Sequence, residues 1–91
     1  MKKLPSDVKA YKRTPEFDEA TVPAGLLKAH QTKEQVWAKI VVHEGELQYT
    51  INEPITEVII LNKNRAGIVE PTVSHSVKPL GHVRFFVEFY S

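Results

Sequence analysis

Histidine and carboxylate side chains are the residues of this chain best suited to chemistry, and the histidines number four: His30, His43, His75 and His82. His43 and His82 lie beside turn signals, so we expect both at the surface without a role. Neutral imidazoles such as His30 and His75 can bind Zn, Fe, Ni or Mn, although such an ion takes three or four protein ligands. The alternative is a pair of histidines that are hydrogen-bonded to their neighbours or to a bound molecule.

Two carboxylates and one tyrosine can be added to these candidates. Glu70 lies at a turn, where it can be a third metal ligand, orient a histidine or remain an exposed loop carboxylate. Glu88 lies within the apolar run 85–90, where it either pairs with Arg84 or another base or faces a wet pocket. Tyr49 can place its hydroxyl at the rim of a pocket, or it can be a packed core residue.

Nucleophilic catalysis is not indicated. The chain has no cysteine, which excludes disulfides, thiolate nucleophiles, zinc fingers and iron–sulfur ligation. It has neither a Gly-x-Ser-x-Gly motif nor a glycine-rich loop that would hold a phosphate. The chemistry that remains open is metal-assisted, with an ion that polarises a substrate or activates water or oxygen.

The composition is typical of one ordinary soluble domain, which we expect to span residues 1–91. Hydrophobic residues make up 42% and charged residues 25%. The net charge is +1, and basic and acidic residues are mixed along the chain, so no nucleic-acid partner is expected. No apolar run resembles a signal peptide or a membrane span, so we expect a cytoplasmic location and no membrane partner.

The N-terminal segment 1–25 contains three of the six prolines. It is therefore predicted to be extended, rich in loops and packed on the rest of the domain, with an edge strand at 8–13. Phe17 and Val22 are expected to anchor it. A helix at 14–20 is not favoured.

From Gly25 onward the pattern predicts short β-strands. Residues 46–51 alternate between apolar and polar side chains, which indicates a half-buried strand. Glu44-Gly45 is interpreted as a tight turn. The expected strands are 26–30, 36–43, 46–51, 57–61, 68–70, 75–77 and 83–90. Such closely spaced strands without helical periodicity predict an all-β fold, an antiparallel sandwich or barrel.

Several sequence blocks, taken in order, resemble the TehB/YeaR-like cupin family over about Tyr11 to Tyr90. The blocks are Pro23-Ala24-Gly25-Leu26, His30-Gln31-Thr32-Lys33, residues 36–47, Val69-Glu70-Pro71 with His75, and residues 85–90. The family includes the N-terminal domain of some tellurite-resistance TehB proteins and standalone YeaR-type proteins. The resemblance implies a single cupin-like jelly-roll domain.

The resemblance also implies where a site would lie. His30 takes the position of the first cupin histidine and His75 that of the last, so both would face one pocket. Thr32 stands where a metal-binding cupin often has its second histidine, and Ala38 falls near the position of the usual glutamate. A divalent transition metal (Zn, Fe, Ni or Mn) is a candidate cofactor that would need a substitute ligand such as Glu70.

Three functions stay open at this point. The first is a cupin that binds a small molecule or an oxyanion, with or without a metal, through His30, His75, Tyr49 and Glu88. The second is a metal-dependent enzyme of the oxygenase or isomerase type that acts on a small polar substrate. The third is a dimeric interaction module without a ligand site, favoured by the apolar residues on both faces of 36–42. A homodimer is expected.

Overall fold

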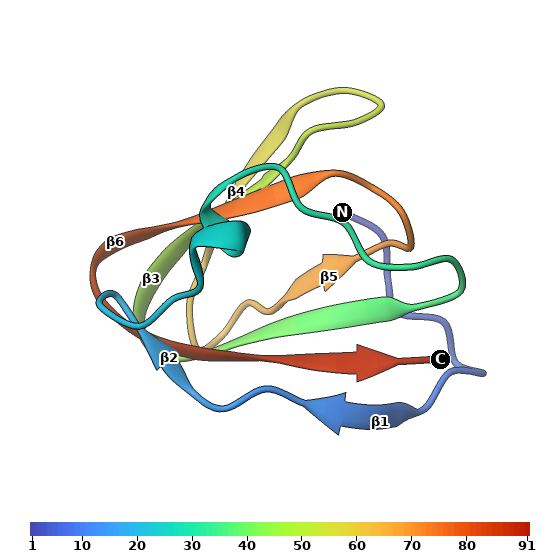
Figure 1. Ribbon diagram of the computed structural model, residues 1–91, viewed down its shortest axis with the longest axis horizontal. Coiled ribbons are helices and arrows are strands. Elements are labelled where there is room, and N and C mark those ends of the chain that lie inside the picture. Colours follow the sequence, from blue (N-terminus) through green and yellow to red (C-terminus); the bar gives the residue numbers. More distant parts are fainter.

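The two longest strands, β3 (Trp37–Ile51) and β6 (His75–Tyr90), pair with each other along almost their whole length and form the frame of the molecule (Figure 1). The computed structural model describes residues 1–91. Six strands form one antiparallel sheet whose main path runs β1-β6-β3-β4. The expected all-β, antiparallel, sandwich-like or barrel-like fold is confirmed.

The shorter elements pair with these two strands. β1 (Ala10–Arg13) and β2 (Phe17–Asp18) pair with β6, whereas β4 (Glu57–Leu61) and β5 (Gly67–Val69) pair with β3. A single 3-10 turn, η1 (Ala24–Leu27), lies against β6. The turn that joins β3 to β4 projects from the rest of the molecule (Figure 1). No helix of the chain is long and apolar enough to span a membrane.

β3 bends at a bulge and does not end at a hairpin. The prediction of a tight turn at Glu44-Gly45 was wrong, because the runs on both sides of it pair with β6. The register shifts on either side of this dipeptide, and Gly45 has a φ of +74°, a conformation that glycine adopts without steric cost. The extra residue reverses the alternation of the strand, so that core residues point inward on both sides of the bend: Ala38, Ile40 and Val42 before it, and Leu47 and Tyr49 after it.

Two further predicted elements differ from the structure. The predicted strand at 26–30 is η1 followed by a single β-bridge at His30, because only that residue pairs with β6. The predicted strands 75–77 and 83–90 are one strand, because the pairing with β3 continues across the bulges. An edge strand does form within 8–13, as β1, and 14–20 contains no helix, as expected.

The core lies between the two halves of the bent sheet. Tyr49 and Phe85 are its largest fully buried side chains, and the Tyr49 hydroxyl donates a hydrogen bond to the Ile68 carbonyl oxygen at 2.8 Å. Phe17 and Val22 pack against this core, as predicted. The N-terminal segment therefore closes one side of the sheet and contributes to the walls of the site.

Candidate functional site

His30 and His75 lie side by side. Their backbones form an antiparallel bridge with both N–H groups donating to the opposite carbonyl oxygen at 2.8 Å. Residues that face each other in such a bridge project to the same side, and the two ring centroids are 5.4 Å apart with the rings at 80°. On its other side His75 pairs with Ile51 of β3, which holds it in the sheet. The expected juxtaposition of the two histidines is therefore present.

His75 is the buried member of the pair, with 4% of its surface exposed. Burial lowers the pKa of its imidazole, and the neighbouring His30 adds to this, while the hydrogen bond to Val73 opposes it. Nδ1 lies 3.1 Å from the Val73 carbonyl oxygen, which can only accept, so the neutral ring carries its proton on Nδ1. Nε2 is then a hydrogen-bond acceptor.

This acceptor is open to a ligand. Nε2 of His75 has no hydrogen-bond partner in the protein. Every fully buried side-chain nitrogen or oxygen of the chain has such a partner, so Nε2 is not fully buried. Because His75 lines the cavity, a ligand there can reach this atom. His30 is exposed, and no hydrogen bond fixes its ring. The pair thus combines a fixed, neutral acceptor with an exposed imidazole that has no hydrogen bond.

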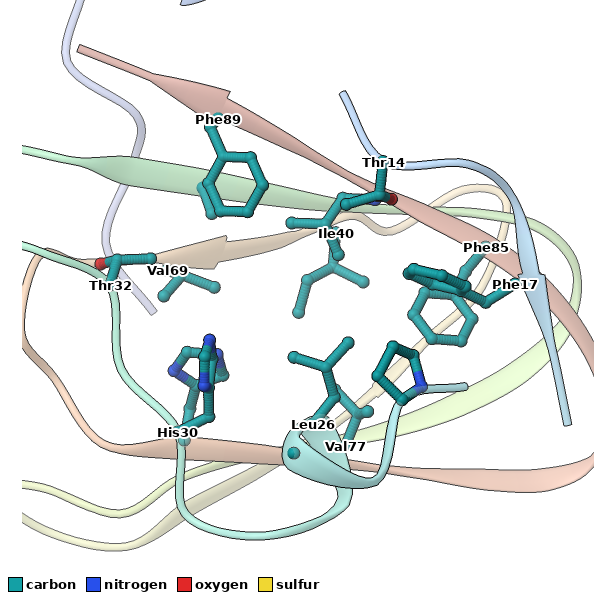
Figure 2. Close-up of a pocket in the computed structure, with 15 residues that line it drawn as sticks. Thr14, Phe17, Leu26, His30, Thr32, Ile40, Val69, Val77, Phe85 and Phe89 are labelled. Atoms are coloured by element: carbon teal, nitrogen blue, oxygen red, sulfur yellow. The ribbon is translucent and has the colours of Figure 1, made fainter. Parts of the chain in front are cut away.

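The cavity has a volume of about 230 Å³. Figure 2 shows His30 and Leu26 on one side of it, Ile40 and Phe89 opposite, and Phe17 with Phe85 at one end. The lining residues come from the N-terminal segment, η1, the loop between η1 and β3, and the strands β3, β5 and β6. They are mostly hydrocarbon: Thr14, Phe17, Pro23, Gly25, Leu26, His30, Thr32, Ala38, Ile40, Val69, His75, Val77, Phe85, Val87 and Phe89.

Thr32 adds no polarity to the cavity. Its hydroxyl donates to the Val36 carbonyl oxygen at 2.8 Å, and Figure 2 shows the oxygen turned away from the centre of the cavity. The polar groups available to a ligand are thus concentrated at the histidine pair.

The other predicted ligand residues do not line the cavity. The Tyr49 ring lies 5.9 Å from the His75 ring, and its hydroxyl is bonded to the backbone. Glu88 accepts hydrogen bonds from Arg13 at 2.9 Å and from the Tyr90 hydroxyl at 2.6 Å on the outer face of β6. The ligand roles of Tyr49 and Glu88 stay predictions.

The donor set does not suit a tightly held metal ion. Glu70 lies 3.5 Å from the Lys2 ammonium nitrogen, and nowhere are three or more histidine or acidic side chains gathered as metal ligands. Two imidazoles alone are fewer ligands than a divalent ion takes. The metal stays a prediction from the resemblance, and no step is assigned to it.

Comparison with known proteins places the chain in a family. Residues 12–87 match the model of the TehB-like domain. This chain belongs to the TehB-like family. No curated protein matches it.

Two solved structures share its fold. A crystal structure of an Escherichia coli K12 protein, a Northeast Structural Genomics Consortium target, superposes with a TM-score of 0.87 at 20% identity, covering 100% of this chain and 97% of that one. TehB from Haemophilus influenzae superposes with a TM-score of 0.84 at 24% identity over 93% of this chain. The match covers 32% of the TehB chain, so this domain spans about a third of that protein.

The cavity wall contains residues that sequence reasoning did not assign to a site. Leu26, Ile40 and Phe89 show the pattern of ordinary core residues, and nothing in their spacing distinguishes a wall from a core. The nearest indication of the wall was Phe17, which was predicted to anchor the N-terminal segment and which lies in the cavity wall. Lys12 and Lys33 were not assigned to a site either, although Lys33 lies in one of the family blocks.

The other two histidines are exposed, as expected. His43 Nδ1 lies 2.6 Å from Glu16, and His82 lies between Glu44 at 2.8 Å and Glu19 at 3.3 Å. The hydrogen bond that His82 donates to the Glu44 carboxylate is the largest of the causes that raise the pKa of His82. His82 and His75 are therefore shifted in opposite directions.

A pH titration followed by NMR should separate these two rings. We expect His82 to titrate above 6.5 and His75 below it, because the first is held by carboxylates and the second is buried. The stability that the His82 contacts contribute is fully present below the pKa of His82 in the unfolded chain, and it is lost as the pH rises through the higher pKa in the folded chain. For His75 the order is reversed. The stability that comes from burying its neutral ring is present above its pKa in the unfolded chain, and it is lost as the pH falls through the lower pKa in the folded chain. In His82→Gln the low-pKa ring signal should remain; a His75 midpoint above 6.5 would contradict its burial as a neutral acceptor.

Proposed function

We propose that this domain binds a small organic molecule in the cavity beside His30 and His75, with the apolar part of the ligand against the hydrocarbon wall and a hydrogen-bond donor on Nε2 of His75. The observation that carries the proposal is the combination of an open cavity of about 230 Å³ with one unpartnered, fixed acceptor. Binding sites for small molecules are commonly apolar with a few placed polar groups.

The size of the cavity limits the ligand. An engineered apolar cavity of about 150 Å³ admits benzene, so a cavity of about 230 Å³ has room for one ring and a few further atoms. An inorganic oxyanion is favoured less, because transfer of an anion from water to a hydrocarbon-lined space is costly without several donors. The link of TehB to tellurite resistance therefore does not define the ligand of this cavity.

Phenol is a suitable first probe, because it combines one ring with one hydroxyl donor. We expect phenol to bind measurably in an NMR titration, with shifts at the residues of the cavity wall, and anisole, which lacks the donor, to bind more weakly. Ala38→Leu places a larger side chain at a wall position that is 1% exposed, and should weaken phenol binding about tenfold or more.

Two further variants make this experiment decisive. Gly25 in η1 lines the cavity, and a Cβ added there meets no atom within 4 Å. The leucine side chain of Gly25→Leu therefore has room to occupy part of the cavity, and this variant should also weaken binding. Ala20→Leu lies at an exposed position outside the cavity and should bind phenol as the natural chain does. The proposal is wrong if phenol and anisole leave all wall resonances unchanged, or if both filled variants, folded by their NMR spectra, bind like Ala20→Leu.

A homodimer also stays a prediction. β4 lies at the edge of the sheet, and Val58 and Ile60 on it are 56% and 37% exposed. We expect this apolar edge strand to form the contact between two copies of the chain, because such edges pair readily.

A further inference from the structure

A second hollow of about 250 Å³ lies next to the cavity. His30, Thr32 and Phe89 line both spaces, so the two are neighbours separated by these side chains. The remaining residues around the second hollow are Tyr11, Lys12, Gln31, Lys33 and Val36. We refer to it as the outer hollow and to the first as the inner cavity.

The two spaces differ in polarity. The inner cavity is lined by hydrocarbon and the histidine pair, whereas the outer hollow contains two lysines and a glutamine. Neither lining includes an aspartate or a glutamate. An apolar space and a cationic one thus meet at His30.

The two lysines are available to a ligand. Lys12 and Lys33 form no ion pair, whereas nearby carboxylates are already paired, Glu88 with Arg13 and Glu70 with Lys2. Lys12 is held in place by β1, where it is the partner of Phe89 on β6. Lys33 follows Thr32, which is anchored by its hydroxyl and by the bond from Thr72 N–H to its carbonyl oxygen at 3.1 Å. Both backbones are therefore fixed beside the outer hollow.

We propose that the inner cavity and the outer hollow form one binding site for an amphipathic organic anion, whose apolar body occupies the inner cavity and whose carboxylate meets Lys12 and Lys33. This inference rests on the proposed function and adds the ligand class to it. The exposed ring of His30, which no hydrogen bond fixes, is the group that turns to let the ligand pass between the two spaces.

The charge of the ligand belongs at the outer end. Nε2 of neutral His75 is an acceptor and does not attract a carboxylate. Among the other lining side chains only His30 has a free donor, because the Thr14 and Thr32 hydroxyls already donate to backbone carbonyl oxygens. At the outer hollow a carboxylate keeps contact with water and gains the attraction of two ammonium groups. Exposed pairs of this kind contribute modestly, so the expected effect is several-fold for each lysine.

Three probes with the same body test this assignment: 4-phenylbutyrate, 4-phenylbutanol and 4-phenylbutylamine, measured by calorimetry with the full chain. We expect the acid to bind about tenfold more tightly than the alcohol, and the amine to bind most weakly. Lys12→Gln and Lys33→Gln should each weaken binding of the acid about threefold and leave the alcohol unchanged. Lys63→Gln, outside both linings, should change neither.

The outcomes separate this inference from the proposed function. If the alcohol binds with shifts at the inner wall but the acid gains nothing over it, or the lysine variants match Lys63→Gln, the anionic ligand class is wrong while the cavity function stands. If neither acid nor alcohol binds and phenol also fails, the cavity function itself is wrong. Acid binding that raised salt does not weaken would also overturn the role of the lysines.

Discussion

Gly45→Ala should destabilise the domain by about 2–4 kcal/mol, because it combines a steric overlap with an unfavourable backbone conformation. A Cβ at this position would overlap the backbone carbonyl oxygen of His82 across the β3–β6 pair, and the φ of +74° disfavours any residue with a side chain. Relief requires the two long strands to separate at the bulge. Urea unfolding followed by circular dichroism measures the loss.

Gly81→Ala is the matched control for this variant. Gly81 has a φ of +84°, but a Cβ added there meets no atom within 4 Å. Its substitution should therefore cost only the backbone term, about 1 kcal/mol. Equal losses in the two variants would mean that the close approach of β3 and β6 at Gly45 is not what requires glycine there.

Phe85→Ala should destabilise the domain by about 3–5 kcal/mol, the usual cost of removing a buried phenylalanine side chain. Phe85 is fully buried, its ring lies 5.6 Å from that of Phe17, and it forms part of the cavity wall. A loss of this size is a large share of the stability of a small domain. The same unfolding measurement applies, with phenol added to test whether the enlarged cavity still binds.

Phe86→Ala provides the comparison for Phe85→Ala, because the neighbouring ring faces the other side of the strand. It is only partly buried and has the Arg13 guanidinium carbon 4.4 Å from its centroid. We expect a loss of about 1 kcal/mol, from a cation–π contact and partial burial. If both variants lost the same stability, the assignment of inner and outer faces along β6 would be wrong.

The sequence predicts the fold class well but not the continuity of the strands. Alternation at 46–51 and at 83–90 identifies strands and their inner faces, because burial on one side of a sheet imposes a period of two. Glu44-Gly45 has the composition of a turn, and a bulge can have the same composition, since certain types of both place a glycine at positive φ. Only the partner strand decides between them, and pairing between distant segments leaves no local signal.

The histidine pair could be predicted from family blocks and not from spacing. His30 lies in a loop held by one bridge, where no periodicity sets the direction of a side chain. The cavity could not be predicted, because an unfilled volume depends on how the small residues Gly25 and Ala38 meet larger ones across the molecule. The ion pairs that occupy Glu70 and Glu88 likewise come from segments far away in sequence.

The shared long strands have a consequence for cooperativity. β3 and β6 each run through both halves of the bent sheet, so the two halves share their two longest strands and differ only in the short ones. Local opening of one half would have to break a strand pair that continues into the other, which favours a single all-or-none transition. The walls of the ligand site and the far end of the sheet should therefore be lost together, and a molecule bound at one end protects the whole domain.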